Sequence, residues 1–413
     1  MSRATPVSRP LPGRRLGPRP LPVHLAVAAA TWGSSLAALP ALRNGSLPWK
    51  APLAPRAESL RAELANAPPE AFAAAVGAEA RRRFGRFLEG IEAYRHHTQR
   101  RAGEEPPLIW RAGTTRLLDY GGDGPVVLAV PSLINRAYVL DLAPGRSLLR
   151  HLAADGFRVV LLDWDAPGAE ERGFGLDDYI AGRLVDAIDA LARQAGGPIR
   201  LLGYCMGGTL ALAAALIARD RIASLALLAT PWDFHAERPE QARALAASLA
   251  PFWPAFEALG EVPLDVLQTL FAALDPQLAL RKFLAFAAQE PDSAEARAFV
   301  ALEDWANDGV PLAVNVARAC LDGWYGANDT AAGRWRVAGR AIDPGAIEIP
   351  ALVVVPERDR IVPPASAAAL GTAIPGARTL RTGLGHVGMV VGGRAEAEVW
   401  RPLATWLKAP GRP

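Results

Sequence analysis

Cysteine is scarce in this chain, and its scarcity excludes one class of protein. The 413 residues include only Cys205 and Cys320. Small secreted folds held together by disulfides need more sulfur than this, so we expect a cytoplasmic protein. An excess of one charge is also lacking, because 45 Lys and Arg residues face 42 Asp and Glu residues. This balance gives no support for nucleic-acid binding.

Long hydrophobic runs are also lacking. Residues 25–42 are uncharged and follow an Arg- and Pro-rich leader, but Gly33, Ser34, Ser35 and Pro40 interrupt them, which disfavours a membrane span. Export is disfavoured too, because no clean small-x-small cleavage site follows. Two interpretations stay open. We favour an apolar helix packed on the main domain over a segment that contacts lipid or polymer.

Short apolar runs alternate with helical segments through the middle and the end of the chain. The predicted strands are residues 126–130, 159–162, 199–202, 225–228 and 352–355, and the helical segments between the first four are residues 148–154, 180–193 and 209–218. This alternation is typical of a mostly parallel sheet covered by helices on both faces, an α/β fold. Right-handed crossovers bring the carboxyl ends of such strands to one edge, where sites form.

Breaks in this rhythm predict how the chain divides into domains. Residues 1–55 are the basic leader with the apolar segment, and residues 56–115 are assigned to N-terminal helices. Residues 116–232 and 344–413 form the α/β core. The interval 233–343 is rich in Ala, Leu and Phe at helical spacing and predicts an inserted helical cap.

One motif carries the strongest chemical signal, the sequence Gly-Tyr-Cys-Met-Gly at residues 203–207. It follows a predicted strand and precedes a predicted helix, as the nucleophile elbow of the α/β-hydrolase fold does, here with Cys205 in place of Ser. Glycines are needed because side chains would collide in so sharp a turn. The positive end of the helix beginning at Met206 favours a thiolate. We prefer this interpretation to that of an inert buried cysteine.

A nucleophile needs a base and an acid that orients the base, and in this fold the acid and then the His follow the nucleophile along the chain. Asp359 lies in the loop after the last predicted strand, with Glu357 as its rival. His386 follows within Gly-His-Val-Gly. No other histidine follows a late strand: these are His24, His96, His97, His151 and His235. We therefore predict the catalytic residues Cys205, Asp359 and His386.

An oxyanion hole is expected from backbone N–H groups. We assign one donor to Met206 and the second to the loop after residue 130, with Ser132, Leu133 and Ile134 as candidates. No metal site is expected, because the histidines lack ligand spacing and Cys320 has no sulfur partner nearby. No nucleotide cofactor is expected either, because the first predicted strand is not followed by a Gly-rich loop.

Several groups of residues resemble the polyhydroxyalkanoate synthases, which polymerise (R)-3-hydroxyacyl-CoA and release CoA. In chain order the groups are Leu133-Ile134-Asn135-Arg136, Tyr138-Val139-Leu140-Asp141-Leu142, Leu162-Asp163-Trp164, Gly203-Tyr204-Cys205-Met206-Gly207-Gly208, Asp359-Arg360-Ile361-Val362-Pro363 and Gly385-His386-Val387-Gly388-Met389. They extend from about Asp119 to the C-terminus. A cysteine elbow combined with the Asn-Arg and Asp-Trp pairs is more specific than a serine elbow.

The resemblance implies that Cys205 carries the acyl group, that His386 is the base and that Asp359 is its partner. It implies a CoA thioester as substrate and no cofactor. The implied partners are hydroxyacyl-CoA, the polyester chain, a second synthase subunit or a homodimer, and the surface of a polymer granule in the cytoplasm. A hydrolase of the same fold stays open as the alternative, either an intracellular polyhydroxyalkanoate depolymerase or a thioesterase.

Overall fold

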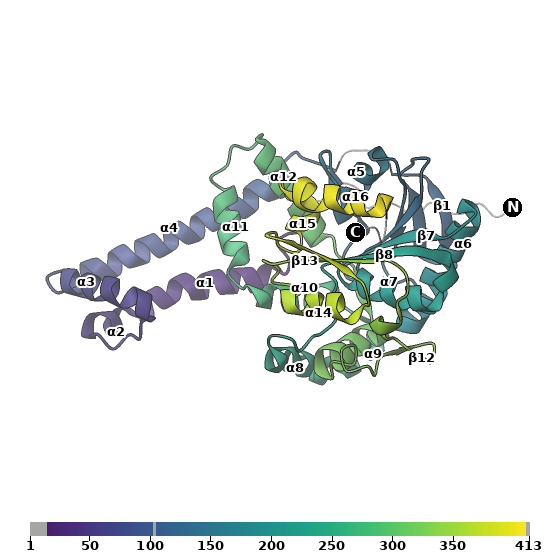
Figure 1. The fold of residues 1–413 in the computed structure, drawn as a ribbon. Coiled ribbons are helices and arrows are strands. Elements are labelled where there is room, and N and C mark those ends of the chain that lie inside the picture. Colours follow the sequence, from purple (N-terminus) through teal and green to yellow (C-terminus); the bar gives the residue numbers. More distant parts are fainter. Residues whose placement is uncertain (1–14, 102–104, 410–413) are drawn as a thin grey trace. The chain divides into compact units, whose positions relative to one another are not determined.

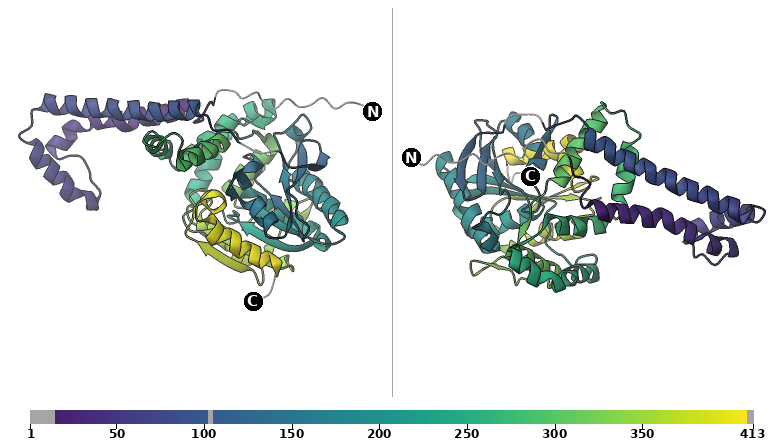
Figure 2. Two further views of the ribbon diagram at one scale, coloured as in Figure 1. Left: turned by 90° about the horizontal axis from the view of Figure 1, so that it is seen from above. Right: turned by 180° about the vertical axis from the view of Figure 1, so that it is seen from behind.

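The computed structural model describes residues 15–101 and 105–409. These residues form two compact units, drawn in Figure 1 and from two further sides in Figure 2. Unit 1 lies within Met1–Gln99 and Asp275–Asn307, and unit 2 within Arg100–Leu274 and Asp308–Pro413. The domain boundaries expected from the sequence stay a prediction. The compact units group residues 275–307 with the N-terminal helices.

Unit 1 is helical. Its helices are α1 (Leu21–Ala37), α2 (Leu39–Asn44), α3 (Ala54–Leu64), α4 (Pro69–His96), α11 (Leu278–Phe286) and α12 (Ala294–Asn307). Pro69 lies in the first turn of α4, where its missing N–H is not needed. The apolar segment of the sequence forms α1, which packs against α4 and α11 of its own unit. No helix among the described residues combines the length and hydropathy that crossing a membrane requires.

Unit 2 is built on an 8-stranded sheet in the order β1-β2-β6-β3-β7-β8-β13-β14. Strands β1 and β2 pair antiparallel, β2 also pairs antiparallel with β6, and the others run parallel. The bounds are β1 (Leu108–Ala112), β2 (Thr115–Asp119), β3 (Val126–Val130), β6 (Arg158–Asp163), β7 (Ile199–Tyr204), β8 (Ile222–Leu228), β13 (Ala351–Pro356) and β14 (Arg378–Thr382). Each predicted apolar run lies within one of these strands, which confirms the α/β fold class.

Helices cover both faces of this sheet (Figure 1). They are α5 (Leu148–Ala154), α6 (Val185–Ala195), α7 (Met206–Ile217), α14 (Pro364–Ala373) and α16 (Arg401–Lys408). Helices α6, α7 and α14 share one apolar core with alternate residues of the strands. Helix α7 has apolar residues all round and is buried along nearly its whole length, as expected for a helix in the centre of a core.

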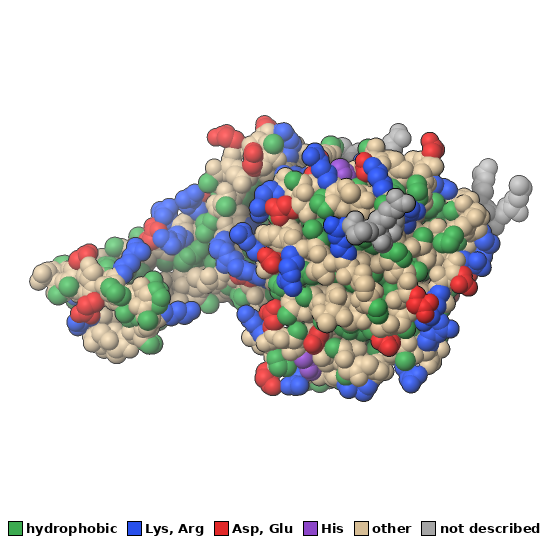
Figure 3. Space-filling view, in the orientation of Figure 1, with side chains coloured by type: hydrophobic (Ala, Val, Ile, Leu, Met, Phe, Trp, Pro, Cys, Tyr) green, Lys and Arg blue, Asp and Glu red, His purple; other side chains and the backbone are tan. Residues whose placement is uncertain are grey.

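A further helical region of unit 2 lies between β8 and β13. It contains α8 (Pro239–Ser248), α9 (Trp253–Leu259), α10 (Leu264–Leu274), α13 (Val314–Arg318), the π-helix η7 (Ala319–Gly326) and the short strands β9 (Glu261–Val262) and β10 (Leu312–Ala313). Positive and negative side chains are interspersed on the face drawn in Figure 3, in keeping with the balanced composition.

The order of the strands in the sheet indicates where the active site lies. The chain passes from β3 to β6 on one side and then to β7 on the other, so the strand order reverses at β3. Sites in parallel sheets form at such a reversal, beyond the carboxyl ends of the strands. The loop after β3 and the turn after β7 meet there, because Val130 pairs with Gly203 in the register of the two strands.

Candidate active site

Cys205 occupies a strained turn between β7 and α7. Its backbone angles are φ 56° and ψ −134°, a conformation that non-glycine residues rarely adopt. The Cys205 N–H donates a hydrogen bond to the carbonyl of Leu228 at 2.9 Å, which ties the turn to the neighbouring strand. Cys205 is half-buried, whereas Cys320 is buried. The turn therefore presents the first sulfur and not the second.

Glycines beside Cys205 allow this turn. A Cβ on Gly203 would lie 2.4 Å from the Cα of Gly208, and a Cβ on Gly207 would lie 2.2 Å from the carbonyl oxygen of Val130. A Cβ on Gly208 would lie 1.9 Å from Oγ1 of Thr230. Side chains in place of these glycines would therefore collide with the backbone or with Thr230 on both sides of the cysteine, as expected for this turn.

His386 and Asp359 lie together beyond the ends of β14 and β13. Nδ1 of His386 lies 2.6 Å from Oδ2 of Asp359, and both side chains are buried. The other carboxylate oxygen of Asp359 accepts hydrogen bonds from the N–H groups of Ile361 at 2.8 Å and Val362 at 2.9 Å. These contacts leave the carboxylate one orientation, with its free edge toward the imidazole.

The rival acid lies elsewhere. The side chain of Glu357 is 52% exposed and pairs with Arg381 at 3.7 Å. The other histidines have contacts of their own; for example, Nε2 of His235 lies 2.8 Å from the carbonyl oxygen of Tyr325. The geometry therefore brings together the three residues selected from the sequence and leaves their rivals apart.

The charges around His386 favour its protonated form. Burial on its own lowers the pKa of His386, but the negative charge of Cys205, the hydrogen bonds to Asp359 and Cys205 and the charge of Asp359 together raise it to about 10. This direction is the one expected for an imidazolium held between a thiolate and a carboxylate. Cys320 has no such neighbours, and burial raises the pKa of its thiol, so it stays neutral.

Two tyrosines of the site were not selected from the sequence. The Tyr204 hydroxyl donates to the backbone carbonyl of His386 at 3.1 Å, and the two rings lie 5.2 Å apart. Burial raises the pKa of Tyr325, and the charge of the nearby Cys205 raises it further. Tyr204 lies inside the elbow motif, so its position was a usable signal, whereas nothing in the sequence near Tyr325 points to the elbow.

The predicted oxyanion donors lie on the expected elements. Met206 is the first residue of α7, and Leu133 and Ile134 lie in the loop after β3. The N–H of Ile134 donates to the hydroxyl of Ser132 at 3.2 Å, so this amide already has a partner. Among the residues that the structure describes, no group of three His, Cys, Asp or Glu side chains could hold a metal ion.

Comparison with known proteins places these features in a family. Residues 125–390 match the model of the alpha/beta hydrolase fold. The poly(3-hydroxyalkanoate) polymerase subunit PhaC of Synechocystis sp. is 33% identical over 292 residues, which cover 68% of this chain and 77% of that protein. The subunit of the same name from Allochromatium vinosum is 30% identical over 286 residues, or 68% of this chain and 80% of that protein.

A longer relative matches over part of its length. The poly(3-hydroxyalkanoate) polymerase subunit PhaC of Haloferax mediterranei is 28% identical over 310 residues, which cover 73% of this chain. The match spans 63% of that protein.

Proposed function

Because this chain belongs to the poly(3-hydroxyalkanoate) polymerase family and to the α/β-hydrolase fold, we propose that it polymerises (R)-3-hydroxyacyl-CoA with Cys205 as the acyl carrier. The observation that carries the proposal is the linked group of Cys205, His386 and Asp359 at the carboxyl ends of β7, β14 and β13. A cysteine suits this reaction because it exchanges one thioester for another, and the acyl group stays activated for the next transfer.

The first half-reaction transfers the acyl group to the enzyme. His386 takes the proton of Cys205, and the thiolate attacks the thioester carbonyl of the substrate. The backbone N–H groups of Met206 and Leu133 stabilise the oxyanion that forms. When the bond from carbon to the CoA sulfur breaks, the imidazolium of His386 gives its proton to the departing CoA thiolate.

The second half-reaction follows from the change in charge. Acylation removes the negative charge of Cys205, which is one of the causes that raise the pKa of His386. The pKa of His386 therefore falls in the acyl-enzyme, so the imidazole that has released its proton stays neutral and is available as a base. It takes the proton of the hydroxyl of another hydroxyacyl unit, whose oxygen attacks the thioester. An ester forms, and the sulfur of Cys205 is released.

The product decides between polymerase and hydrolase, because both use the same three residues. Purified protein is incubated with 3-hydroxybutyryl-CoA, with and without a candidate second subunit, and CoA, polymer and free acid are measured. We expect CoA and polymer. Free 3-hydroxybutyrate without polymer would contradict the proposal and favour the hydrolase.

The cysteines supply a matched pair of variants. We expect Cys205→Ala to lose CoA release by at least about 1,000-fold, since the nucleophile is gone. Cys320→Ala should keep it, because that thiol is buried and neutral. Iodoacetamide should alkylate Cys205 and spare Cys320, as mass spectrometry of tryptic peptides would measure. Normal turnover by Cys205→Ala would overturn the covalent mechanism.

A further inference from the structure

The loop after β3, residues 131–136, is held in place from the turn after β6. The indole N–H of Trp164 donates a hydrogen bond to the carbonyl oxygen of Pro131 at 3.0 Å. Both residues are buried, so this carbonyl has no access to water as a substitute partner. The bond joins residues 33 apart in sequence and fixes the start of the loop that carries Leu133 and Ile134.

The same carbonyl also touches the elbow. A Cβ on Gly207 would lie 2.4 Å from the carbonyl oxygen of Pro131, so this oxygen rests directly against the backbone of the first turn of α7. The Pro131 carbonyl is therefore confined between Gly207 and the Trp164 indole. Its position sets the distance between the two proposed oxyanion donors, one in the loop and one at Met206.

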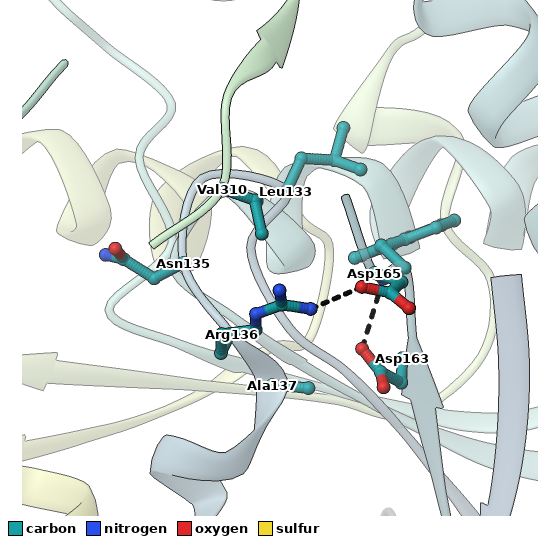
Figure 4. A pocket seen from close by; sticks show the side chains of 8 residues that line it. Leu133, Asn135, Arg136, Ala137, Asp163, Asp165 and Val310 are labelled. Carbon is teal, nitrogen blue, oxygen red and sulfur yellow. Dashed lines mark hydrogen bonds and ion pairs between the residues drawn. The ribbon is translucent and has the colours of Figure 1, made fainter. Parts of the chain in front are cut away.

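The far end of the loop is held by charge. Arg136 forms an ion pair with Asp165, as Figure 4 shows. Asp165 has φ 58°, and its N–H donates to Oδ1 of Asp163 at 3.1 Å. Arg116 of β2 forms an ion pair with Asp163 in turn. Residues 163–165 thus connect the loop to the sheet at both of its ends.

A third support for the loop comes from residues 309–310, which follow α12 in sequence. Asn135 forms a β-bridge with Gly309, and the N–H of Val310 donates to the carbonyl of Ile134 at 3.4 Å. Leu133, Asn135, Arg136 and Val310 line a small pocket at this place (Figure 4).

We propose that Trp164 is a positioning residue for the oxyanion hole, acting through its hydrogen bond to Pro131. The proposal rests on the proposed function, because it assigns to the loop a donor that acts when the thioester carbonyl becomes an oxyanion. Removing a single oxyanion donor costs roughly 10²–10³-fold in rate, and a misplacement of about 1 Å can cost about 10²-fold. The loss affects the transition state and not the binding of substrate.

The test is Trp164→Phe, which removes the indole N–H and keeps an aromatic ring. Its matched control is Trp400→Phe in the same unit, because the indole N–H of Trp400 is also buried and has no hydrogen-bond partner among the described residues. For each variant we would measure the rate of Cys205 acylation by 3-hydroxybutyryl-CoA and by p-nitrophenyl butyrate, and the rate of its alkylation by iodoacetamide. Alkylation needs the thiolate but forms no oxyanion.

We expect Trp164→Phe to slow acylation by roughly 10–100-fold, with KM and the alkylation rate within about twofold of the wild type. Trp400→Phe should change none of these quantities by more than about twofold. Acylation by Trp164→Phe at the rate of Trp400→Phe would overturn the proposal. So would a parallel loss of acylation and alkylation, because it would indicate general damage to the site.

Three further outcomes are separable. If Trp164→Phe does not fold, benzothienylalanine at position 164 keeps the shape of the indole, replaces its N–H by sulfur and is measured in the same way. If the wild type is acylated by the p-nitrophenyl ester but not by the CoA thioester, the polymerase proposal fails, and the ester still decides the role of Trp164. If neither substrate acylates Cys205, both proposals fail.

Discussion

At the scale of single residues, the protonation state of His386 depends on two neighbouring anions of different kinds. The carboxylate of Asp359 does not react and is oriented by two backbone N–H groups, whereas the charge of Cys205 disappears when the sulfur is acylated. One side chain can therefore act as an acid toward the departing CoA and then as a base toward the incoming hydroxyl. The sequence predicted these three residues by their order along the chain, but the balance of their charges required the distances.

This balance predicts a pH dependence. The pKa of His386 is raised from 6.5 to about 10, so the imidazolium that protonates CoA persists well above neutral pH. The alkaline limb of kcat/KM for CoA release should therefore lie far above pH 6.5. The same shift stabilises the fold fully below pH 6.5, and this stabilisation is lost as pH rises toward about 10. Rates and Tm measured from pH 6 to about 10.5 would check both statements.

Asp359→Asn tests the cause of the raised pKa. Without the carboxylate, the alkaline limb should move toward lower pH, and kcat should fall by about 10²–10⁴-fold, because the imidazole loses its orientation as well as its charge partner. Glu357→Gln is the matched control, since it removes an exposed carboxylate two residues away in sequence. Equal shifts of the limb in both variants would contradict the assignment of Asp359.

At the scale of elements, apolar runs predicted the strands that are buried on both faces. The run 126–130 coincides with β3, and the run 199–202 lies within β7. The sequence did not locate β14, because Arg378–Thr382 is polar at every position except Leu380, lies at the edge of the sheet and has no apolar run. It also missed the antiparallel pair β1 and β2. Strands at the edge of a sheet carry a weak hydrophobic signal, because part of their surface faces water and can bear polar side chains.

The strand, turn and helix around Cys205 give the prediction at this scale. Gly207→Ala places a Cβ 2.2 Å from the carbonyl oxygen of Val130 and 2.4 Å from that of Pro131. Neither backbone oxygen can rotate away, so α7 must shift from β3. We expect a loss of roughly 1–3 kcal/mol in the free energy of unfolding and at least a 100-fold loss of CoA release, on the order of one removed oxyanion donor.

The control for this substitution is Gly182→Ala. Gly182 lies in a helical segment, and a Cβ there would meet nothing within 4 Å. Alanine favours helix over glycine by roughly 0.5–1 kcal/mol, so this variant should be slightly stabilised and fully active. Urea denaturation and CoA release would measure both effects. Full activity of Gly207→Ala would show that the first turn of α7 is not constrained as the distances indicate.

At the scale of the whole molecule, two segments distant in sequence share unit 1. The Tyr94 hydroxyl, on α4, donates to Oδ1 of Asp304, on α12, at 3.0 Å. The aromatic ring of Phe283, on α11, contacts that of Tyr94 with the centroids 5.8 Å apart. The sequence predicted helices here but placed residues 275–307 in the cap, because helical periodicity shows which face is buried and not which partner covers it.

Unit 1 has a core of its own, and that core predicts independent unfolding. Phe283 is fully buried, and its ring contacts those of Phe87, Tyr94 and Phe299. Phe283→Ala should therefore destabilise unit 1 by roughly 3–5 kcal/mol, whereas Phe252→Ala, at an exposed site of unit 2, should cost little. Calorimetry should show two transitions, of which Phe283→Ala lowers only one, with alkylation of Cys205 unchanged at 25 °C. Two transitions are expected because each unit buries its own apolar residues. A single transition that shifts as a whole would mean that the units unfold together.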